Sequence, residues 1–337
     1  MTSSQEKKWR LLRCRLGRHP IWCAWQVTYR CNFRCRFCSY WRDEMGRQPE
    51  QTIEQFETGA KKLAKWGSLL ISLAGGEPLL RDDIVEIVKV IGQWHFPFIT
   101  TNGYLTDEKL AQNLFSAGLW GVSISIDYAD AERHDRARGM KGAYEQAVRA
   151  LKLFSRARKY DWQRVNLMCV LLDDNLEQVE SLIQLAARNN AYFMIQPYSS
   201  EKTGSTKFYP KAANGVSNHL LELRRRYPNF LSNPLFLSNF DQYLNGGVPD
   251  CAAGRAFFNI DSTGDIAICV EQRDRPVANL YTDDMFSIGR KLRDGGKDNS
   301  CRNCWYNCRG EVESLYHIKG LWQSLPTLLF DRGQPEK

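Results

Sequence analysis

The sequence lacks a long apolar run, a signal-peptide pattern and any repeat. No apolar segment reaches the roughly 18–20 residues needed to cross a bilayer. The first residues lack the order of short basic, long apolar and small-residue regions that directs secretion. Neither an internal repeat nor a low-complexity tract is visible, which argues against a repeat array. These absences predict an ordinary globular protein of the cytoplasm.

A large imbalance of charge is also missing. The chain has 46 Lys and Arg against 38 Asp and Glu, a net charge of +8 over 337 residues. Such a moderate excess favours anionic partners in general, for example a phosphate-bearing ligand, an anionic membrane surface or an acidic peptide. It does not single out nucleic acid, and no nucleic-acid partner is expected.

Cysteine, in contrast, is abundant. A reducing compartment disfavours structural disulfides, and the eleven cysteines are an odd number, so pairing does not explain them. Eight of them form two groups, which indicates metal ligation. The groups are Cys31, Cys35 and Cys38, and Cys251, Cys269, Cys301, Cys304 and Cys308. Cys14, Cys23 and Cys169 stand apart and are expected to be small apolar residues, with Cys169 a remote candidate for proton transfer.

Short apolar runs alternate with amphipathic stretches through the first 200 residues. The pattern predicts six strands, and the intervening periodicity predicts five helices. The strands are expected at 21–28, 68–74, 97–101, 121–126, 165–171 and 192–197. Strands and helices in this order form right-handed βαβ units and a parallel sheet.

One strand indicates that the sheet encloses a ligand. In the stretch 122–127, Val122, Ile124 and Ile126 share one face, whereas Ser123, Ser125 and Asp127 share the other. A strand covered by helices on both faces should be apolar on both. We therefore expect an α/β fold, a partial (β/α)6 TIM-like barrel with a small C-terminal β-hairpin extension.

The spacing Cys31-x3-Cys35-x2-Cys38 comes directly after the first predicted strand. Iron–sulfur clusters usually take four thiolates, so three would leave one iron open to an external ligand. A structural zinc site completed by Cys23 or a distant histidine, and a chance cluster, are the alternatives. The spacing alone leaves these open.

The cysteine loop Cys31-Asn32-Phe33-Arg34-Cys35-Arg36-Phe37-Cys38, preceded by Thr28-Tyr29-Arg30, resembles the signature of the radical S-adenosylmethionine superfamily. Three later segments resemble further motifs of that family at successive strand ends. They are Gly75-Gly76-Glu77-Pro78, Thr100-Thr101-Asn102-Gly103, and Ser123-x-Ser125-x-Asp127 followed by Arg138-Gly139. The resemblance covers about residues 25–200.

The resemblance implies a [4Fe–4S] cluster on Cys31, Cys35 and Cys38 that binds S-adenosylmethionine. Reductive cleavage of this cofactor would give a 5′-deoxyadenosyl radical that abstracts hydrogen from a substrate. The implied cofactor contacts are Gly75, Gly76, Glu77 and Pro78 at the methionine amine, Asn102, Ser125 at the ribose, Arg138 at the carboxylate, and Gln196 at the adenine. No catalytic acid or base is assigned.

The second cysteine group surrounds a predicted hairpin at 256–269, with a compact Cys301-x2-Cys304-x3-Cys308 segment after it. By spacing alone, zinc and a second iron–sulfur cluster are nearly equal candidates. The arrangement resembles the SPASM/twitch extension of the same superfamily, which holds auxiliary [4Fe–4S] clusters. A full extension has seven cysteines, so five imply one auxiliary cluster, with Cys251, Cys269, Cys301 and Cys304 as ligands and Cys308 an alternate ligand or free.

Four regions follow from these patterns: a basic N-terminal segment 1–20, a core 21–200, a connection 201–250 and an auxiliary-cluster domain 251–337. The expected function is radical modification of a ribosomal peptide or a small-molecule or lipid metabolite, with a reductant such as flavodoxin or ferredoxin. The basic N-terminus and the apolar segment 315–330 either pack onto the barrel or contact a membrane. The alternative is a non-enzymatic, zinc-binding protein that interacts with nucleic acid.

Overall fold

The structure is a computed structural model, and it describes residues 4–42, 48–160, 162–210, 214–297 and 299–320. All six expected core strands are present, each within a few residues of its predicted bounds. They are β1 (Trp22–Thr28), β2 (Leu70–Gly75), β3 (Phe96–Thr101), β4 (Gly121–Ser125), β5 (Arg164–Leu171) and β6 (Tyr192–Pro197). Each pairs in parallel with the next along the chain.

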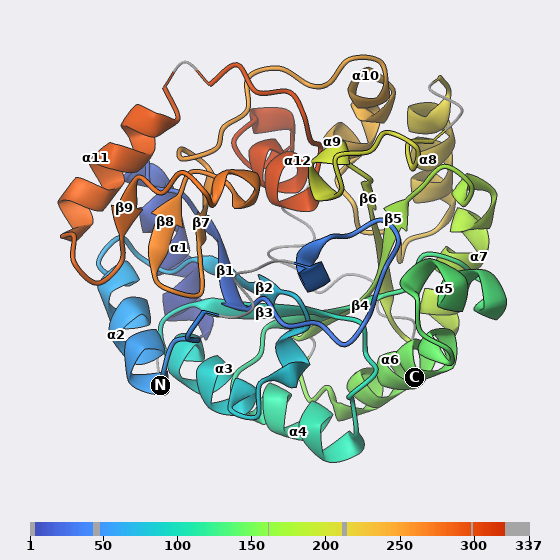
Figure 1. Ribbon diagram of the computed structural model, residues 1–337, viewed down its shortest axis with the longest axis horizontal. Helices are drawn as coiled ribbons and strands as arrows, with labels where there is room; N and C mark the ends of the chain where they lie inside the picture. The colour runs from blue at the N-terminus through green and yellow to red at the C-terminus, as the bar shows by residue number, and fades with distance from the viewer. Residues whose placement is uncertain (1–3, 43–47, 161, 211–213, 298, 321–337) are drawn as a thin grey trace.

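The five expected helices lie between these strands, and one further helix, α5, which was not expected, lies between β4 and α6. They surround the outside of the curved sheet (Figure 1). The helices are α2 (Ile53–Leu63), α3 (Ile84–Gly92), α4 (Glu108–Ser116), α5 (Ala131–Arg138), α6 (Ala143–Ala157) and α7 (Val179–Arg188). A capping box at Thr52, with Gln55 as its partner, begins α2. Their apolar faces and the outward faces of the strands form one large core.

The C-terminal hairpin extends the same sheet. Strand β7 (Phe257–Ile260) pairs in parallel with β1, and β8 (Asp265–Ala267) and β9 (Ala278–Asn279) follow in antiparallel order. The sheet therefore has nine strands in the order β6-β5-β4-β3-β2-β1-β7-β8-β9. The first and last core strands do not pair, so the barrel is open, as expected.

Helix α12 (Asn307–Ser314) lies in the opening of the barrel, against β1 and β7 on one side and α9 (Pro234–Ser238) on the other (Figure 1). The connection 201–250 also holds α8 (Val216–Arg226) and α10 (Phe240–Leu244). Helix α11 (Met285–Gly295) packs beside β9. Hence the residues around the second cysteine group are brought next to the barrel interior.

The N-terminal segment forms helix α1 (Ser4–Leu16), which was not expected as a helix. Its inner side is anchored to the barrel by Arg10, which donates to the Ala64 carbonyl at 3.0 Å, and by Lys7, which donates to the Gly92 carbonyl at 2.9 Å. Most of the apolar segment 315–330 lies outside the described residues. Among the described residues, no helix is both long and apolar enough to cross a bilayer.

Candidate active site

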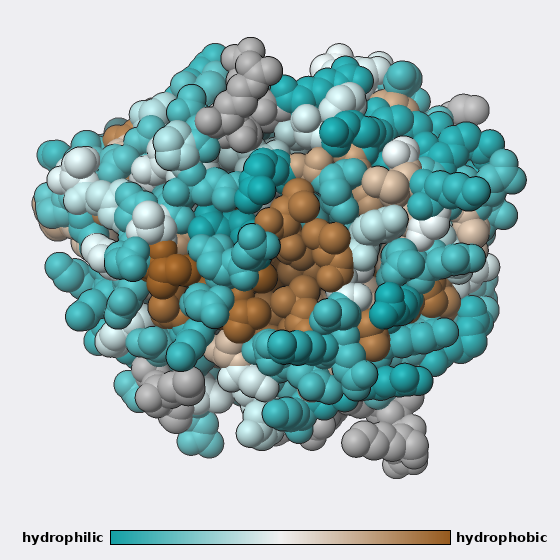
Figure 2. Space-filling model, turned by 60° about the horizontal axis from the view of Figure 1, so that its bottom comes forward, coloured by the Kyte–Doolittle hydropathy of each residue, from teal (hydrophilic) through white to brown (hydrophobic). Residues whose placement is uncertain are grey.

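A cavity of about 470 Å³ runs along the inside of the barrel. Alternate residues of β1, namely Trp22, Ala24 and Gln26, line it from one end of the strand to the other. Their neighbours on β2 are Leu70, Ser72 and Ala74, and the small side chains of Ala24 and Ser72 leave the middle of the barrel unfilled. Figure 2 shows an apolar hollow on the surface, ringed by hydrophilic residues.

Cys31, Cys35 and Cys38, the predicted cluster ligands, all line this cavity. Burial raises the pKa of Cys31 to about 11 and that of Cys35 to about 12. A buried thiol releases its proton when a metal replaces it, so these side chains suit a cluster that neutralises their charge. Phe33 and Phe37 pack around the loop and are buried.

The cysteine loop packs closely against Gly75 and Gly76, at the end of β2. The Gly76 amide donates to the Thr28 carbonyl at 2.9 Å, and the Glu77 amide donates to the Arg30 carbonyl at 2.8 Å. A Cβ atom on Gly76 would lie 2.0 Å from the Arg30 oxygen, and one on Gly75 would lie 1.8 Å from the Thr28 oxygen. Only glycine permits this approach of two backbones.

Glu77 ties the second strand end to the third. Its buried carboxylate accepts hydrogen bonds from the Thr101 hydroxyl and the Asn102 amide, both at 2.7 Å. Burial raises the pKa of this carboxyl group. The Asn102 side chain in turn donates to the Asn32 side chain at 2.8 Å, inside the cysteine loop. The motifs at three strand ends thus form one connected network.

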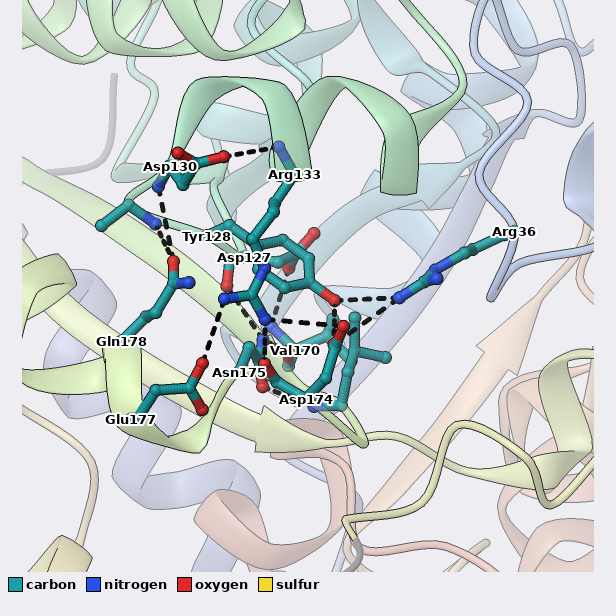
Figure 3. Close-up of polar contacts among 12 residues, drawn as sticks. Arg36, Asp127, Tyr128, Asp130, Arg133, Val170, Asp174, Asn175, Glu177 and Gln178 are labelled. Carbon is teal, nitrogen blue, oxygen red and sulfur yellow. Dashed lines mark hydrogen bonds and ion pairs between the residues drawn. The ribbon is translucent and has the colours of Figure 1, made fainter.

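Arg138 forms a buried ion pair with Asp127. Its Nε and Nη2 atoms both lie 2.7 Å from the same carboxylate oxygen. The other oxygen of Asp127 accepts from the Val170 amide at 2.9 Å (Figure 3). Coulombic attraction from Asp127 outweighs burial and holds the pKa of Arg138 above its usual range. Arg138 also lines the cavity, 5.2 Å from the Phe37 ring.

A second polar cluster connects the cysteine loop to α5 and to the loop after β5 (Figure 3). Arg36, between two of the cysteines, donates to the Tyr128 hydroxyl at 3.1 Å and lies 3.6 Å from Asp174. The Tyr128 hydroxyl donates to Asp174 at 2.5 Å, and Arg133 also pairs with Asp174. Sequence reasoning missed this cluster because its members are distant in the chain and follow no motif.

Ser125, Asn102 and Gln196 lie on the cavity wall, where the resemblance placed cofactor contacts. Gln196 accepts a hydrogen bond from the Asn307 amide at 3.4 Å, so it also joins β6 to α12. The cavity wall further includes Glu311, on α12, which sequence reasoning missed. Burial raises the pKa of Glu311 to about 7.

All five C-terminal cysteines line a second cavity of about 60 Å³. Burial raises the pKa of Cys251 to about 11 and that of Cys269 to about 12. Cys308 lines both this small cavity and the large one, together with Tyr306 and Val270. The hairpin and the Cys301–Cys308 segment therefore meet around one site, as the spacing predicts.

The remaining cysteines are core residues. Cys14, Cys23 and Cys169 are fully buried among apolar side chains, as expected for small apolar residues. Cys169 belongs to the core outside the cavity wall, between Met168 and Val170, which do line the cavity. Burial raises its pKa well above the usual value, so this thiol does not suit proton transfer at neutral pH.

The positions of the two cysteine groups fit iron–sulfur clusters. Three thiols on one cavity wall suit a cluster with an open iron, and five thiols around a small cavity suit a fully ligated one. The fold and site thus define an iron–sulfur enzyme built on an open α/β barrel.

Residues 25–186 form a domain of the radical S-adenosylmethionine superfamily. The profile described as "Radical SAM superfamily" matches residues 25–186. The mycofactocin maturase MftC of Mycolicibacterium smegmatis is 28% identical over 329 residues, covering 90% of this chain and 80% of the maturase. The AdoMet-dependent heme synthase of Methanosarcina barkeri is 31% identical over 168 residues, covering 50% and 47% of the two chains.

Solved structures share the fold. Streptococcus suis SuiB bound to its precursor peptide SuiA aligns with a TM-score of 0.64 at 18% identity, covering 88% of this chain and 69% of SuiB. The protein anSMEcpe with bound AdoMet also aligns at 0.64, with 17% identity and 92% and 98% coverage. The protein is therefore an enzyme that uses S-adenosylmethionine and a [4Fe–4S] cluster, and the zinc-binding alternative has no support.

Proposed function

We propose that this enzyme modifies a peptide inside the barrel cavity, between the cysteine loop and the C-terminal extension. The observation that carries the proposal is the large cavity itself, because its wall includes Cys31, Cys35 and Cys38 at one place and Cys308 at another. An apolar wall of this size suits the side chain and backbone of a peptide residue. The relative named a maturase, and SuiB with its precursor peptide, support the choice of substrate class.

In this proposal Cys31, Cys35 and Cys38 hold the cluster to which S-adenosylmethionine binds. The cluster together with bound S-adenosylmethionine would supply a 5′-deoxyadenosyl radical for hydrogen abstraction. The Gly75–Pro78 turn, Asn102, Ser125, Arg138 and Gln196 are the cofactor contacts. Arg138 is already paired with Asp127, so its orientation is fixed before the cofactor binds.

Cys251, Cys269, Cys301 and Cys304 are the proposed ligands of one auxiliary cluster. Cys308 completes the wall between that cluster and the substrate cavity. In this proposal residues 21–200 form the core, residues 201–250 the connection and residues 251–337 the auxiliary unit.

The net charge of +8 suits an acidic one-electron carrier such as flavodoxin or ferredoxin as reductant. Reduced thiols favour the cytoplasm as the location.

The peptide proposal is tested by anaerobic incubation of the reconstituted enzyme with S-adenosylmethionine, dithionite and a synthetic peptide encoded beside its gene. We expect 5′-deoxyadenosine to accumulate together with a change in the mass of the peptide. A scrambled peptide of the same composition is the control. Equal turnover with both peptides, and no mass change in either, would reject a peptide substrate in favour of a small-molecule or lipid metabolite.

The outer face of α1 favours a membrane contact as a further partner. Trp9, Leu12 and Leu16 recur at helical spacing and are 72%, 42% and 70% exposed. Exposed Lys8 and Arg13 flank them, the combination found in helices that lie on anionic membranes. The opposite face is anchored to the barrel, so packing onto the barrel and a membrane contact are compatible on different sides of this helix.

Flotation with vesicles of phosphatidylglycerol or phosphatidylcholine tests this contact. We expect binding to the anionic vesicles, and its loss when Trp9, Leu12 and Leu16 are all replaced by Ser. Phe286→Ser is a matched control, because Phe286 is 78% exposed on α11, away from this stripe. Binding that is absent from the unaltered protein, or that survives the triple replacement, rejects the contact.

A further inference from the structure

A buried ion pair crosses the wall between the two cavities. The ammonium of Lys202 lies 2.5 Å from the Glu271 carboxylate, and the two side chains are 21% and 9% exposed. Lys202 ends a short 3-10 turn after β6 and lines the large cavity. Glu271 follows Cys269 by two residues and lines the small cavity. The pair therefore joins the two cysteine sites.

Further contacts tie Lys202 to both cysteine groups. The Ser39 hydroxyl, next to Cys38, donates to the Lys202 carbonyl at 2.5 Å. The Lys202 ammonium lies 4.7 Å from the Tyr40 ring and 5.1 Å from the Tyr306 ring. Tyr306 precedes Cys308 by two residues. Hence one cation contacts the segments that follow or precede a cysteine in each group.

A second cation, Arg273, lies beside this pair. Arg273 lies 4.0 Å from Glu271 and 5.0 Å from the Tyr40 ring, with 23% of its side chain exposed. The Glu271 carboxylate keeps the pKa of Lys202 above its usual range, although burial acts in the opposite direction. Because the pair is shielded from water, a change in either charge acts strongly on nearby groups.

We propose that Lys202 and Glu271 act with opposite sign on the reduction potential of the auxiliary centre, so that each cancels the shift that the other alone would cause, with both residues as positioning residues. The inference rests on the two-cluster assignment given under the proposed function. Reduction adds a negative charge to a cluster, so a nearby cation raises its potential and a nearby anion lowers it. As a neutral pair, Lys202 and Glu271 offset each other at both sites.

The proposal predicts opposite effects for the two partners. Lys202→Met removes the nearer positive charge, leaves Glu271 with the more distant Arg273, and lowers the auxiliary potential. Glu271→Gln leaves Lys202 unbalanced and raises it. The double variant returns close to the unaltered potential, and Lys202→Arg, which keeps the charge, does so as well. The measurement is a redox titration of the reconstituted full chain followed by electron paramagnetic resonance. A variant with Cys31, Cys35 and Cys38 replaced by Ala identifies the auxiliary signal.

Lys291→Met is the matched control. Lys291 lies on α11, its ammonium is 2.7 Å from the Asp283 carboxylate, and it lines neither cavity. Shifts of the same sign in the Lys202→Met and Glu271→Gln variants, or shifts no larger than in this control, would overturn the proposal. So would an auxiliary signal that is lost in Lys202→Met and not restored in the double variant, because a neutralised pair should restore the site.

The titration requires no turnover, so its outcome is separate from that of the proposed function. Opposite shifts of the auxiliary potential in Lys202→Met and Glu271→Gln, without any 5′-deoxyadenosine from the unaltered protein, would reject the proposed function and retain the role of the Lys202–Glu271 pair. Normal formation of 5′-deoxyadenosine without opposite shifts would reject the pairing and retain the proposed function.

Discussion

At the scale of single residues, charges near the cysteine loop are buried in pairs. Asp127 is fully buried, and its partner Arg138 is 8% exposed. A charge at such a depth is tolerated when an opposite charge and hydrogen bonds satisfy it. Asp127 meets both conditions, through Arg138 and the Val170 amide. The resemblance identified both residues, but their mutual pairing is visible in the structure alone.

Asp127→Asn should destabilise the fold by about 3 kcal/mol, because it leaves the Arg138 guanidinium buried without a counter-charge. Urea denaturation followed by circular dichroism measures the change. The matched control is Glu132→Gln, which breaks the exposed Arg136–Glu132 pair and should leave the midpoint unchanged. Equal midpoints for the two variants would show that the buried pair does not stabilise the fold.

His95 makes stability depend on pH. Its Nδ1 accepts from the Leu69 amide, its Nε2 faces the Ala60 carbonyl at 2.8 Å, and burial lowers its pKa to about 4. The unfolded chain binds the proton near pH 6.5, so the stabilisation is complete above that pH and is lost as the pH falls toward 4. Between pH 7.5 and 5.5 the loss is about 1.4 kcal/mol.

Urea midpoints of the unaltered protein and of His95→Gln, measured at pH 7.5 and 5.5, test this. The stability difference between the two proteins should shrink by the same amount at the lower pH. A difference that is independent of pH would mean that His95 is protonated equally in the folded and unfolded states.

At the scale of elements, the periodicity of apolar residues predicted the strands and helices whose formation depends on short-range patterns in the sequence. The six core strands and the five main helices follow from apolar spacing and capping signals. Helix α5 was not expected, because its run of charges reads as a solvated segment. Helix α1 was read as a basic segment for the same reason. The Arg36–Asp174 and Lys202–Glu271 contacts could not be predicted, since each joins elements far apart in the sequence.

Gly76→Ala should displace the cysteine loop from the end of β2. The added methyl group would collide with the Arg30 carbonyl, which cannot move without breaking the Glu77–Arg30 hydrogen bond. We expect reconstituted protein to lose iron from the first site and to bind S-adenosylmethionine at least tenfold more weakly, as measured by equilibrium dialysis. Gly289→Ala is the control, because this glycine lies inside helix α11 and a Cβ there would meet its nearest atoms at 3.4 Å, an ordinary contact distance. Unchanged affinity in Gly76→Ala would contradict the close approach.

At the scale of the whole molecule, the auxiliary unit and the barrel share one sheet. The sequence predicted a separate C-terminal domain with a hairpin, and the hairpin is present as β7 and β8. What the sequence could not indicate is that β7 pairs with β1, because strand order depends on contacts between distant segments. This pairing places the second cysteine group beside the barrel cavity and makes the two units mechanically continuous.

Unfolding should therefore be a single cooperative transition. Ile260→Ala, in the fully buried core of β7, should destabilise the whole chain by about 2–4 kcal/mol. Circular dichroism and tryptophan fluorescence should give coincident curves for both proteins. A separate early transition, with the barrel unaffected, would mean that the extension folds independently.

The central claim is that Cys31, Cys35 and Cys38 hold the cluster that cleaves S-adenosylmethionine. The most direct measurement is anaerobic incubation of the reconstituted protein with S-adenosylmethionine and dithionite, followed by chromatography for 5′-deoxyadenosine. The account predicts this product from the unaltered protein and from Cys14→Ala, which changes a core thiol, and its absence from Cys35→Ala. Undiminished 5′-deoxyadenosine from Cys35→Ala would contradict it.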